Sequence, residues 1–185
     1  MKLESDDLVN QPVEDLVFDI RSQEDFQKLR RAWTTLPKIP KLVDGPACPI
    51  ILESGGQVIR TLLRGEESAG ALMVAYVTMA PGGGGAPNHH QPLEDEFWFC
   101  VQGEWEWKIG NLERRVGPGA FAYAPRNTTH SFRNVGDTEA AMFTVNTPAG
   151  HERGFQAAHK LLAEKAPASA IRESFKRHDF IFHEA

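Results

Sequence analysis

The sequence has little of several features that define particular classes of protein. Its two cysteines, Cys48 and Cys100, form no Cys-x-x-Cys pair, so we expect neither a zinc cluster nor a disulfide framework. No apolar run approaches the roughly 20 residues needed to cross a bilayer. The first ten residues are acidic and polar, unlike a signal peptide. We therefore expect a soluble, cytoplasmic protein with no membrane partner.

Positive charge is also scarce. The chain carries 20 Lys and Arg against 25 Asp and Glu, which gives a net charge of −5 and a pI near 5.8. No basic cluster is long enough to follow a phosphate backbone, and this argues against a nucleic-acid partner. A length of 185 residues with 41% hydrophobic content suits one domain with a core of its own.

Composition divides the chain into an N-terminal arm (1–46), a central domain (47–150) and a C-terminal helical extension (151–185). In the arm, Ser22 can cap a helix over Gln23–Thr35. An apolar stripe at helical spacing runs along this helix and consists of Phe26, Leu29, Trp33 and Leu36. The extension is again helical in pattern, over Glu152–Lys165 and Ala168–Arg177, and a short apolar piece follows.

The central domain contains short runs of β-branched and aromatic residues, each bounded by Gly, Pro or Asn, which is the pattern of antiparallel strands. We expect nine strands, at Ile50–Glu53, Gln57–Leu63, Ala71–Met79, Glu96–Gln102, Glu104–Ile109, Glu113–Val116, Ala120–Ala124, His130–Asn134 and Ala140–Val145. Because no helical pattern separates them, the sequence predicts an all-β sandwich or barrel with helices at its two ends.

Histidine and carboxylate side chains fall at or just before the start of two of these strands. The first block reads His89-x-Gln91-x4-Glu96-x6-Gly103. The second block reads Gly119-x5-Pro125-x-Asn127-x2-His130-x3-Asn134. Two strand entries that each bring an imidazole can meet across a barrel, and a site with nitrogen and oxygen ligands can then form from distant parts of the sequence.

These two blocks resemble the motifs of the cupin superfamily, H-x-H-x4-E-x6-G and G-x5-P-x-G-x2-H-x3-N. The likeness covers about Ile50 to Phe155, and its last part resembles the single-domain cupins related to quercetin 2,3-dioxygenase. The resemblance implies a double-stranded β-helix, or jelly-roll, barrel. It also implies one divalent transition metal, without distinguishing Fe, Ni, Mn, Cu and Zn, with His89, Glu96 and His130 as ligands.

Two residues depart from the motifs. Gln91 stands where the family has its second metal-binding histidine, and an amide oxygen is a weaker donor to these metals than imidazole. Asn127 replaces a turn glycine, and asparagine tolerates the left-handed backbone conformation well. His90 should face outward if His89 faces inward, unless a local bulge turns it toward the site as a replacement ligand.

Strand alternation also predicts which side chains line a substrate pocket. If Glu96 and His130 face the interior, then Trp98, Cys100 and Phe132 do so as well. Tyr76 is a further pocket candidate because it has a polar tip on an otherwise apolar strand. Three further histidines, His159, His178 and His183, lack regular ligand spacing and are expected on the surface.

The resemblance favours an enzyme that acts on a small organic molecule in the barrel, first of all an oxygen-dependent dioxygenase in which Glu96 exchanges a proton with the substrate. A metal-dependent isomerase or lyase that needs no oxygen is the first alternative. A non-catalytic small-molecule binder or sensor, in which Gln91 marks lost metal affinity, is the second. Trp105 and Trp107 lie on one face of a strand and belong either to the core or to a dimer contact. We also expect a homodimer, with the arm or an outer sheet face, offering these two tryptophans, at the interface.

Overall fold

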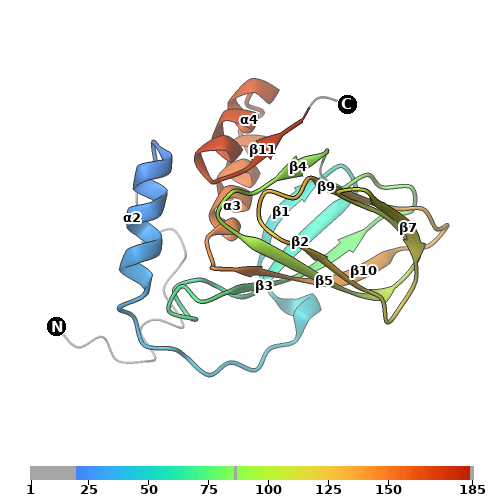
Figure 1. Cartoon of the computed structure of the whole chain (residues 1–185), viewed down its shortest axis with the longest axis horizontal. Helices are drawn as coiled ribbons and strands as arrows, with labels where there is room; N and C mark the ends of the chain where they lie inside the picture. Colours follow the sequence, from blue (N-terminus) through green and yellow to red (C-terminus); the bar gives the residue numbers. More distant parts are fainter. Residues whose placement is uncertain (1–19, 86, 184–185) are drawn as a thin grey trace.

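The computed structural model describes residues 20–85 and 87–183 (Figure 1). Its helices are α2 (Gln23–Trp33), η2 (Gly45–Ala47), α3 (His151–Ala163) and α4 (Ala168–Arg177). Its strands are β1 (Ile50–Ser54), β2 (Gln57–Leu63), β3 (Met73–Met79), β4 (His89–His90), β5 (Asp95–Gln102), β6 (Trp105–Ile109), β7 (Leu112–Val116), β8 (Phe121–Ala124), β9 (His130–Asn134), β10 (Ala140–Thr147) and β11 (Ile181–Phe182). Within these ranges, no helix is long and apolar enough to span a membrane.

The strands form two antiparallel sheets that face each other as a jelly-roll barrel (Figure 1). One sheet has the order β1-β2-β3-β10-β5-β8, and the other has the order β11-β4-β9-β6-β7. The predicted all-β barrel with an N-terminal helix and C-terminal helices is therefore confirmed. Two strands that the sequence pattern did not predict, β4 and β11, have only two residues each and pair with one another.

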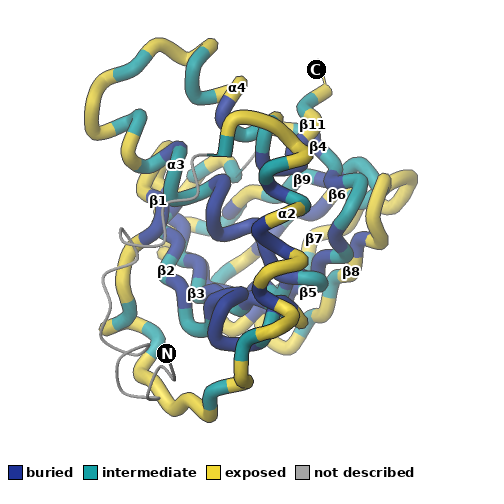
Figure 2. Tube along the Cα trace, turned by 90° about the vertical axis from the view of Figure 1, so that its left-hand side faces the viewer, coloured by how far each residue is buried: buried dark blue, intermediate teal, exposed yellow. Residues whose placement is uncertain are grey.

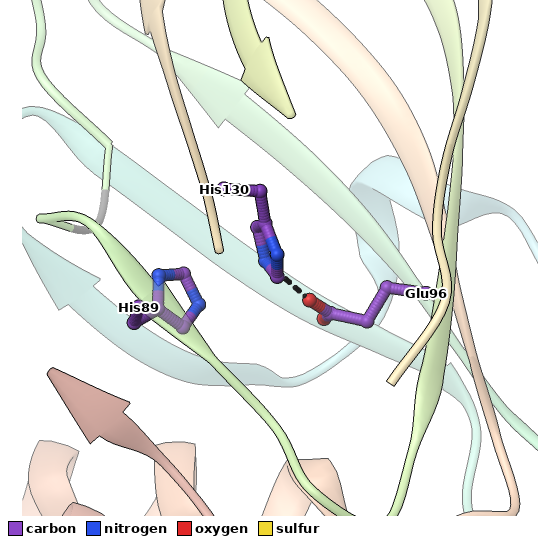
Figure 3. A group of neighbouring side chains, drawn as sticks. All are labelled: His89, Glu96 and His130. Atoms are coloured by element: carbon purple, nitrogen blue, oxygen red, sulfur yellow. Dashed lines mark ion pairs between the residues drawn. The ribbon is translucent and has the colours of Figure 1, made fainter. Parts of the chain in front are cut away.

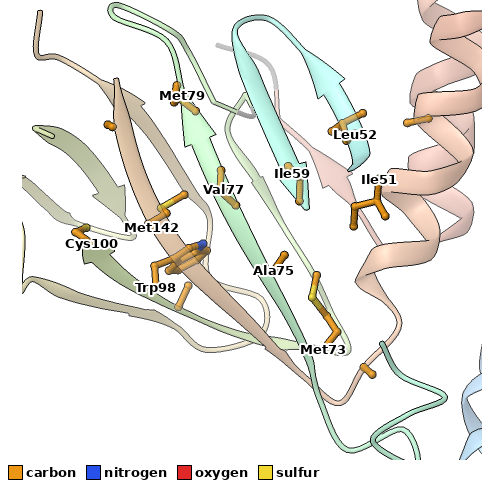
Figure 4. Packing of buried hydrophobic residues seen from close by; sticks show 14 of the residues in the cluster. Ile51, Leu52, Ile59, Met73, Ala75, Val77, Met79, Trp98, Cys100 and Met142 are labelled. Atoms are coloured by element: carbon orange, nitrogen blue, oxygen red, sulfur yellow. The ribbon is translucent and has the colours of Figure 1, made fainter. Parts of the chain in front are cut away.

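The interior of the barrel is filled by every second residue of the strands, as the pleat requires (Figure 4). Ala75, Val77 and Met142 are almost fully buried between the sheets. Trp105 and Trp107 are also buried, at 0% and 4% exposure. Of the two expected places for these tryptophans, the core is confirmed and the outer interface face was wrong, because the inner face of β6 carries them into the barrel.

Helix α2 covers the side of the barrel with its apolar stripe. Ser22 caps it as predicted, since its Oγ accepts a hydrogen bond from the Asp25 N–H at 3.2 Å. Phe26, Leu29 and Trp33 are buried against this chain itself (Figure 2). Trp33 packs so closely that a Cβ on Gly65 would lie 2.3 Å from its ring. The stripe needs no partner molecule to cover it.

His178 corrects the expectation that His159, His178 and His183 all lie on the surface. It is buried at the end of α4, with its ring 5.6 Å from that of Phe26. Its Nδ1 lies 2.7 Å from the Ser174 carbonyl oxygen. The helical extension and the arm therefore pack against one another around this side chain.

Large apolar side chains remain exposed on the outer face of β5 and β8. Phe99, Phe121 and Tyr123 are each more than two-fifths exposed. Tyr76 belongs to this outer face too, because its ring contacts Phe143 at 5.4 Å while its neighbours along β3 point inward. Tyr76 was expected to line the pocket, and the pleat of β3 places it on the opposite side of the sheet.

Candidate metal centre

Three elements bring the predicted ligands together inside the barrel (Figure 3). His89 begins β4 and lies opposite His130, the first residue of β9, in the strand register. Glu96 approaches from β5 in the other sheet. One ligand atom from each of the three residues lies within 4.8 Å of the others. All three side chains are buried, with exposures of 3%, 3% and 2% for His89, Glu96 and His130.

The backbone fixes the orientation of both imidazoles. His89 Nδ1 lies 2.8 Å from the Pro87 carbonyl oxygen, and His130 Nδ1 lies 2.9 Å from the Thr128 carbonyl oxygen. A carbonyl oxygen only accepts, so in both rings Nδ1 carries the proton and donates it. The lone pair of Nε2 is thus left free on each ring, which is the arrangement that histidine ligands of metals adopt.

The free lone pair of His130 faces a carboxylate. Its Nε2 lies 2.6 Å from Glu96 Oε2, and neither atom has a hydrogen-bond donor among the described residues. Two buried lone pairs at this distance repel each other unless a cation or a proton lies beside them. Two imidazoles and one carboxylate are also a donor set that divalent transition metals accept. The residues therefore fit a metal ion.

In the metal-free site, burial and neighbouring groups keep His89 neutral and Glu96 ionised. Burial, together with the neighbouring His130, lowers the pKa of His89 to about 3, so the ring is neutral and able to bind a metal at pH 7. Burial alone raises the pKa of Glu96, but the neighbouring imidazole of His151, the largest opposing influence, helps to hold the pKa well below its usual range. Glu96 is thus an anionic carboxylate in the folded protein.

Gln91 and His90 occupy opposite sides of the chain after His89. Gln91 is 2% exposed, and its Nε2 has no hydrogen-bond partner among the described residues. His90 faces outward, as alternation predicts, and its Nδ1 lies 2.7 Å from His183 Nε2. His90 does not replace the missing motif histidine, because its ring is held at the surface by His183, which follows β11.

Another imidazole at the site, that of His151, was not predicted from the sequence. This residue begins helix α3, is buried, and places its Nε2 3.4 Å from Glu96 Oε1. Its Nδ1 lies 3.0 Å from Glu94 Oε2. Burial lowers the pKa of His151, but the carboxylates of Glu96 and Glu94 outweigh this effect and raise it above its usual value.

Of the predicted pocket residues, Trp98 lies beside the ligands, with its ring 5.0 Å from that of His130. Phe132 is further away, 6.3 Å from Trp98 between ring centres, and packs on Trp107. Cys100 lies further along β5 and lines a recess with Trp107, Arg114 and Tyr123. The barrel interior beside the ligands is thus predominantly aromatic.

The C-terminal strand covers the ligands from outside. In β11, Phe182 pairs with His89 in the strand register. The rings of Phe180 and Phe182 lie 5.7 Å and 5.9 Å from the His89 ring. Backbone pairing continues beyond β11, since the His183 N–H donates to the Asn88 carbonyl oxygen at 2.9 Å. These contacts explain the nearly complete burial of His89.

Comparison with known proteins agrees with this geometry. Residues 75–146 match the family model described as Cupin domain. The chain therefore contains a cupin domain, and its barrel has the cupin fold. Over 105 residues it is 26% identical to quercetin 2,3-dioxygenase of Bacillus subtilis (strain 168), an alignment that covers 53% of this chain and 31% of that protein. The chain thus spans about a third of the length of this relative.

Solved structures share the fold at low sequence identity. KdgF from a Halomonas species superposes with a TM-score of 0.52 and 19% identity, covering 59% of this chain and 94% of that one. A predicted oxalate decarboxylase from Thermotoga maritima has a TM-score of 0.51 and 18% identity, covering 58% and 99%. Likeness at this level establishes the architecture and does not fix the type of reaction.

Proposed function

We propose that the protein is a metal-dependent enzyme that acts on a small organic molecule inside the barrel, with dioxygen as the second substrate. His89, Glu96 and His130 would hold one divalent transition metal, and Gln91 could offer an amide oxygen as a weaker fourth donor. The observation that carries this proposal is the pair of facing lone pairs, His130 Nε2 and Glu96 Oε2, buried without any donor among the described residues.

The chain's own groups divide the work around the site. The carbonyl oxygens of Pro87 and Thr128 keep the two imidazoles in the metal-binding tautomer. Trp98 forms an aromatic wall beside the ligands, suited to a flat apolar substrate. When bound, a divalent transition metal supplies Lewis acidity and, if it is redox-active, one-electron chemistry. When it is not tightly bound to the ion, Glu96 would exchange a proton with a substrate hydroxyl group.

The dioxygenase reaction rests on the relative named quercetin 2,3-dioxygenase, which shares 26% identity with this chain over 105 residues. That segment covers just over half of the chain, so the reaction is proposed by similarity. One specific observation favours a second candidate, a non-catalytic small-molecule binder or sensor. Gln91 replaces an imidazole at a motif position, which would weaken metal binding and could leave a ligand-binding barrel without catalysis.

The test begins with metal analysis of protein purified without chelators, compared with the His130→Ala variant. His159→Ala on α3 is the matched control, since this histidine is not among the residues that converge on the site. We expect close to one equivalent of metal in the wild type and the control and a large loss in His130→Ala.

Oxygen uptake is then measured with flavonols and other small phenolic and enolic compounds. Uptake that requires the metal supports the dioxygenase. Turnover of a carbonyl or enol compound without uptake would replace it with isomerase or lyase chemistry. A protein without metal that still binds one of these compounds would establish the sensor.

A further inference from the structure

Helix α3 brings an imidazole to the metal centre from outside the barrel. His151 is the first residue of this helix and lies beyond the segment, residues 75–146, that matches the cupin model. It is 2% exposed, and its ring is held between aromatic side chains, 4.2 Å from Phe180 and 4.7 Å from Phe155 between ring centres. The ring therefore has one defined orientation, in contact with Glu96.

The two oxygens of Glu96 have different surroundings. Oε2 faces His130 Nε2 and lacks a donor. Oε1 accepts a hydrogen bond from Asn146 Nδ2 at 2.5 Å and lies 3.4 Å from His151 Nε2. Oε1 is thus occupied by polar groups of the chain itself, whereas Oε2 is left on the side of the ligand histidines His89 and His130.

The far side of His151 is anchored by a second buried carboxylate. Its Nδ1 lies 3.0 Å from Oε2 of Glu94, a residue that is 1% exposed. Arg30, on helix α2, approaches the other oxygen of Glu94 at 3.7 Å. The close approach of α3 depends on Gly150, because a Cβ there would lie 2.6 Å from Phe26 and 3.0 Å from Glu94 Oε1.

We propose that His151 is a positioning residue of the metal centre. Anchored by Glu94, it holds Oε1 of Glu96 together with Asn146, so that Oε2 is presented to the ion as a single oxygen ligand. This inference rests on the metal binding proposed above. It assigns a role at the site to the helices outside the barrel, and residues of this kind tune metal affinity without touching the ion.

His151 bridges Glu94 and Glu96, and the test uses two substitutions that each keep only one of these two contacts. The amide of Asn in His151→Asn reaches roughly the position of Nδ1 and keeps the bond to Glu94, but it does not reach Glu96. The amide nitrogen of Gln in His151→Gln reaches roughly the position of Nε2 and can still donate to Glu96. His159→Gln, on the same helix, is the control. Cobalt(II) affinity is measured by chelator competition, and copper(II)-loaded samples are examined by pulsed EPR to count bound imidazoles.

We expect a loss of cobalt affinity of about 10- to 100-fold in His151→Asn. We expect the affinity to recover largely in His151→Gln and to stay unchanged in His159→Gln. EPR should count two imidazoles in the wild type and in all variants. Unchanged affinity in His151→Asn would overturn the positioning role and leave the proposed metal site intact. Three bound imidazoles in the wild type would also overturn it, since His151 would then be a ligand.

Metal binding by the wild type and the folding of His151→Asn are checked first. A wild type that binds neither metal would overturn both this inference and the proposed function. If His151→Asn does not fold, which circular dichroism would show, Glu94→Gln takes its place, because it removes the charged anchor from the other end of the bridge. Glu94→Gln should then lower the cobalt affinity in the same direction, and an unchanged affinity would overturn the inference.

Discussion

The buried carboxyl group of Asp179 should make the free energy of unfolding depend on pH, and the structure gives both the size and the pH range of this dependence. It lies between α4 and β11, is 1% exposed, and its Oδ2 accepts a hydrogen bond from the Leu93 N–H at 2.8 Å. Burial raises the pKa of this carboxyl from 3.8 to about 6, and the nearby Glu94 acts in the same direction. The substitution Asp179→Asn removes the ionisable group.

A raised pKa means that the folded state binds the proton more tightly than the unfolded state does. The free energy of unfolding of the wild type therefore falls as the pH rises from about 4 to above 6. The shift of roughly two pKa units corresponds to about 3 kcal/mol in full. About 1.4 kcal/mol of it falls between pH 5 and pH 8. The Asn variant has no ionisable group at this position. The difference in free energy of unfolding, variant minus wild type, should therefore increase by these amounts as the pH rises over the same ranges.

Urea unfolding of both proteins at pH 5 and pH 8, with chelator present, measures the effect. Comparing the two pH values cancels any packing change that does not depend on pH. Backbone strain is not expected to interfere, because Asp179 has a φ of 77° and asparagine adopts this conformation readily. The amide oxygen of Asn can also accept the bond from Leu93. Parallel stability curves for the two proteins across this pH range would refute the reasoning.

Three other predictions concern ligands, turns and association. Gln91→His should raise the affinity for zinc or nickel, because imidazole is a stronger donor than an amide; unchanged affinity in chelator competition would mean that residue 91 does not reach the ion. Gly103→Ala should lower the free energy of unfolding by about 2 kcal/mol or more, since φ is 77° and the new Cβ would lie 2.5 Å from Ala140; an unchanged melting temperature would contradict this. We expect a homodimer through the exposed face that carries Phe99 and Phe121, and light scattering that gives 20.6 kDa would exclude it.

The sequence predicted the barrel because its strands are long enough to show alternation and end at recognisable turns. The motif positions have physical reasons that the structure now gives. Gly103 and Asn127 both have a positive φ, as expected for a turn glycine and the asparagine in place of one. Asn134 donates to the carbonyl oxygens of Met79, Ala80 and Thr138, and so ties two loops together. These are local requirements, and a linear pattern can record them.

What the sequence did not predict depends on contacts between distant segments. Strands β4 and β11 are too short to show a period. Strand β4 is defined by its pairing with β9 on one side and β11 on the other, and β11 by its pairing with β4. His151 follows no spacing rule relative to the motif, since it enters the site at the start of a helix docked from outside. The preceding Gly150 was the available signal, because a glycine next to a histidine at a helix start allows close approach. Tyr76 could have been placed correctly from the inward-facing Ala75 beside it.

The cover that Phe180 and Phe182 form over His89 has a consequence for the kinetics of metal exchange. With all three ligands almost fully enclosed, we expect an ion to reach or leave them only during local opening of the chain, and detachment of β11 from β4 is the opening that uncovers His89. Release would then proceed at the rate of this local opening, and above a certain chelator concentration it would no longer depend on how much chelator is added. Competition experiments on this protein therefore need incubation times set by the opening rate, and a metal loaded during folding would be retained far longer than its equilibrium affinity implies.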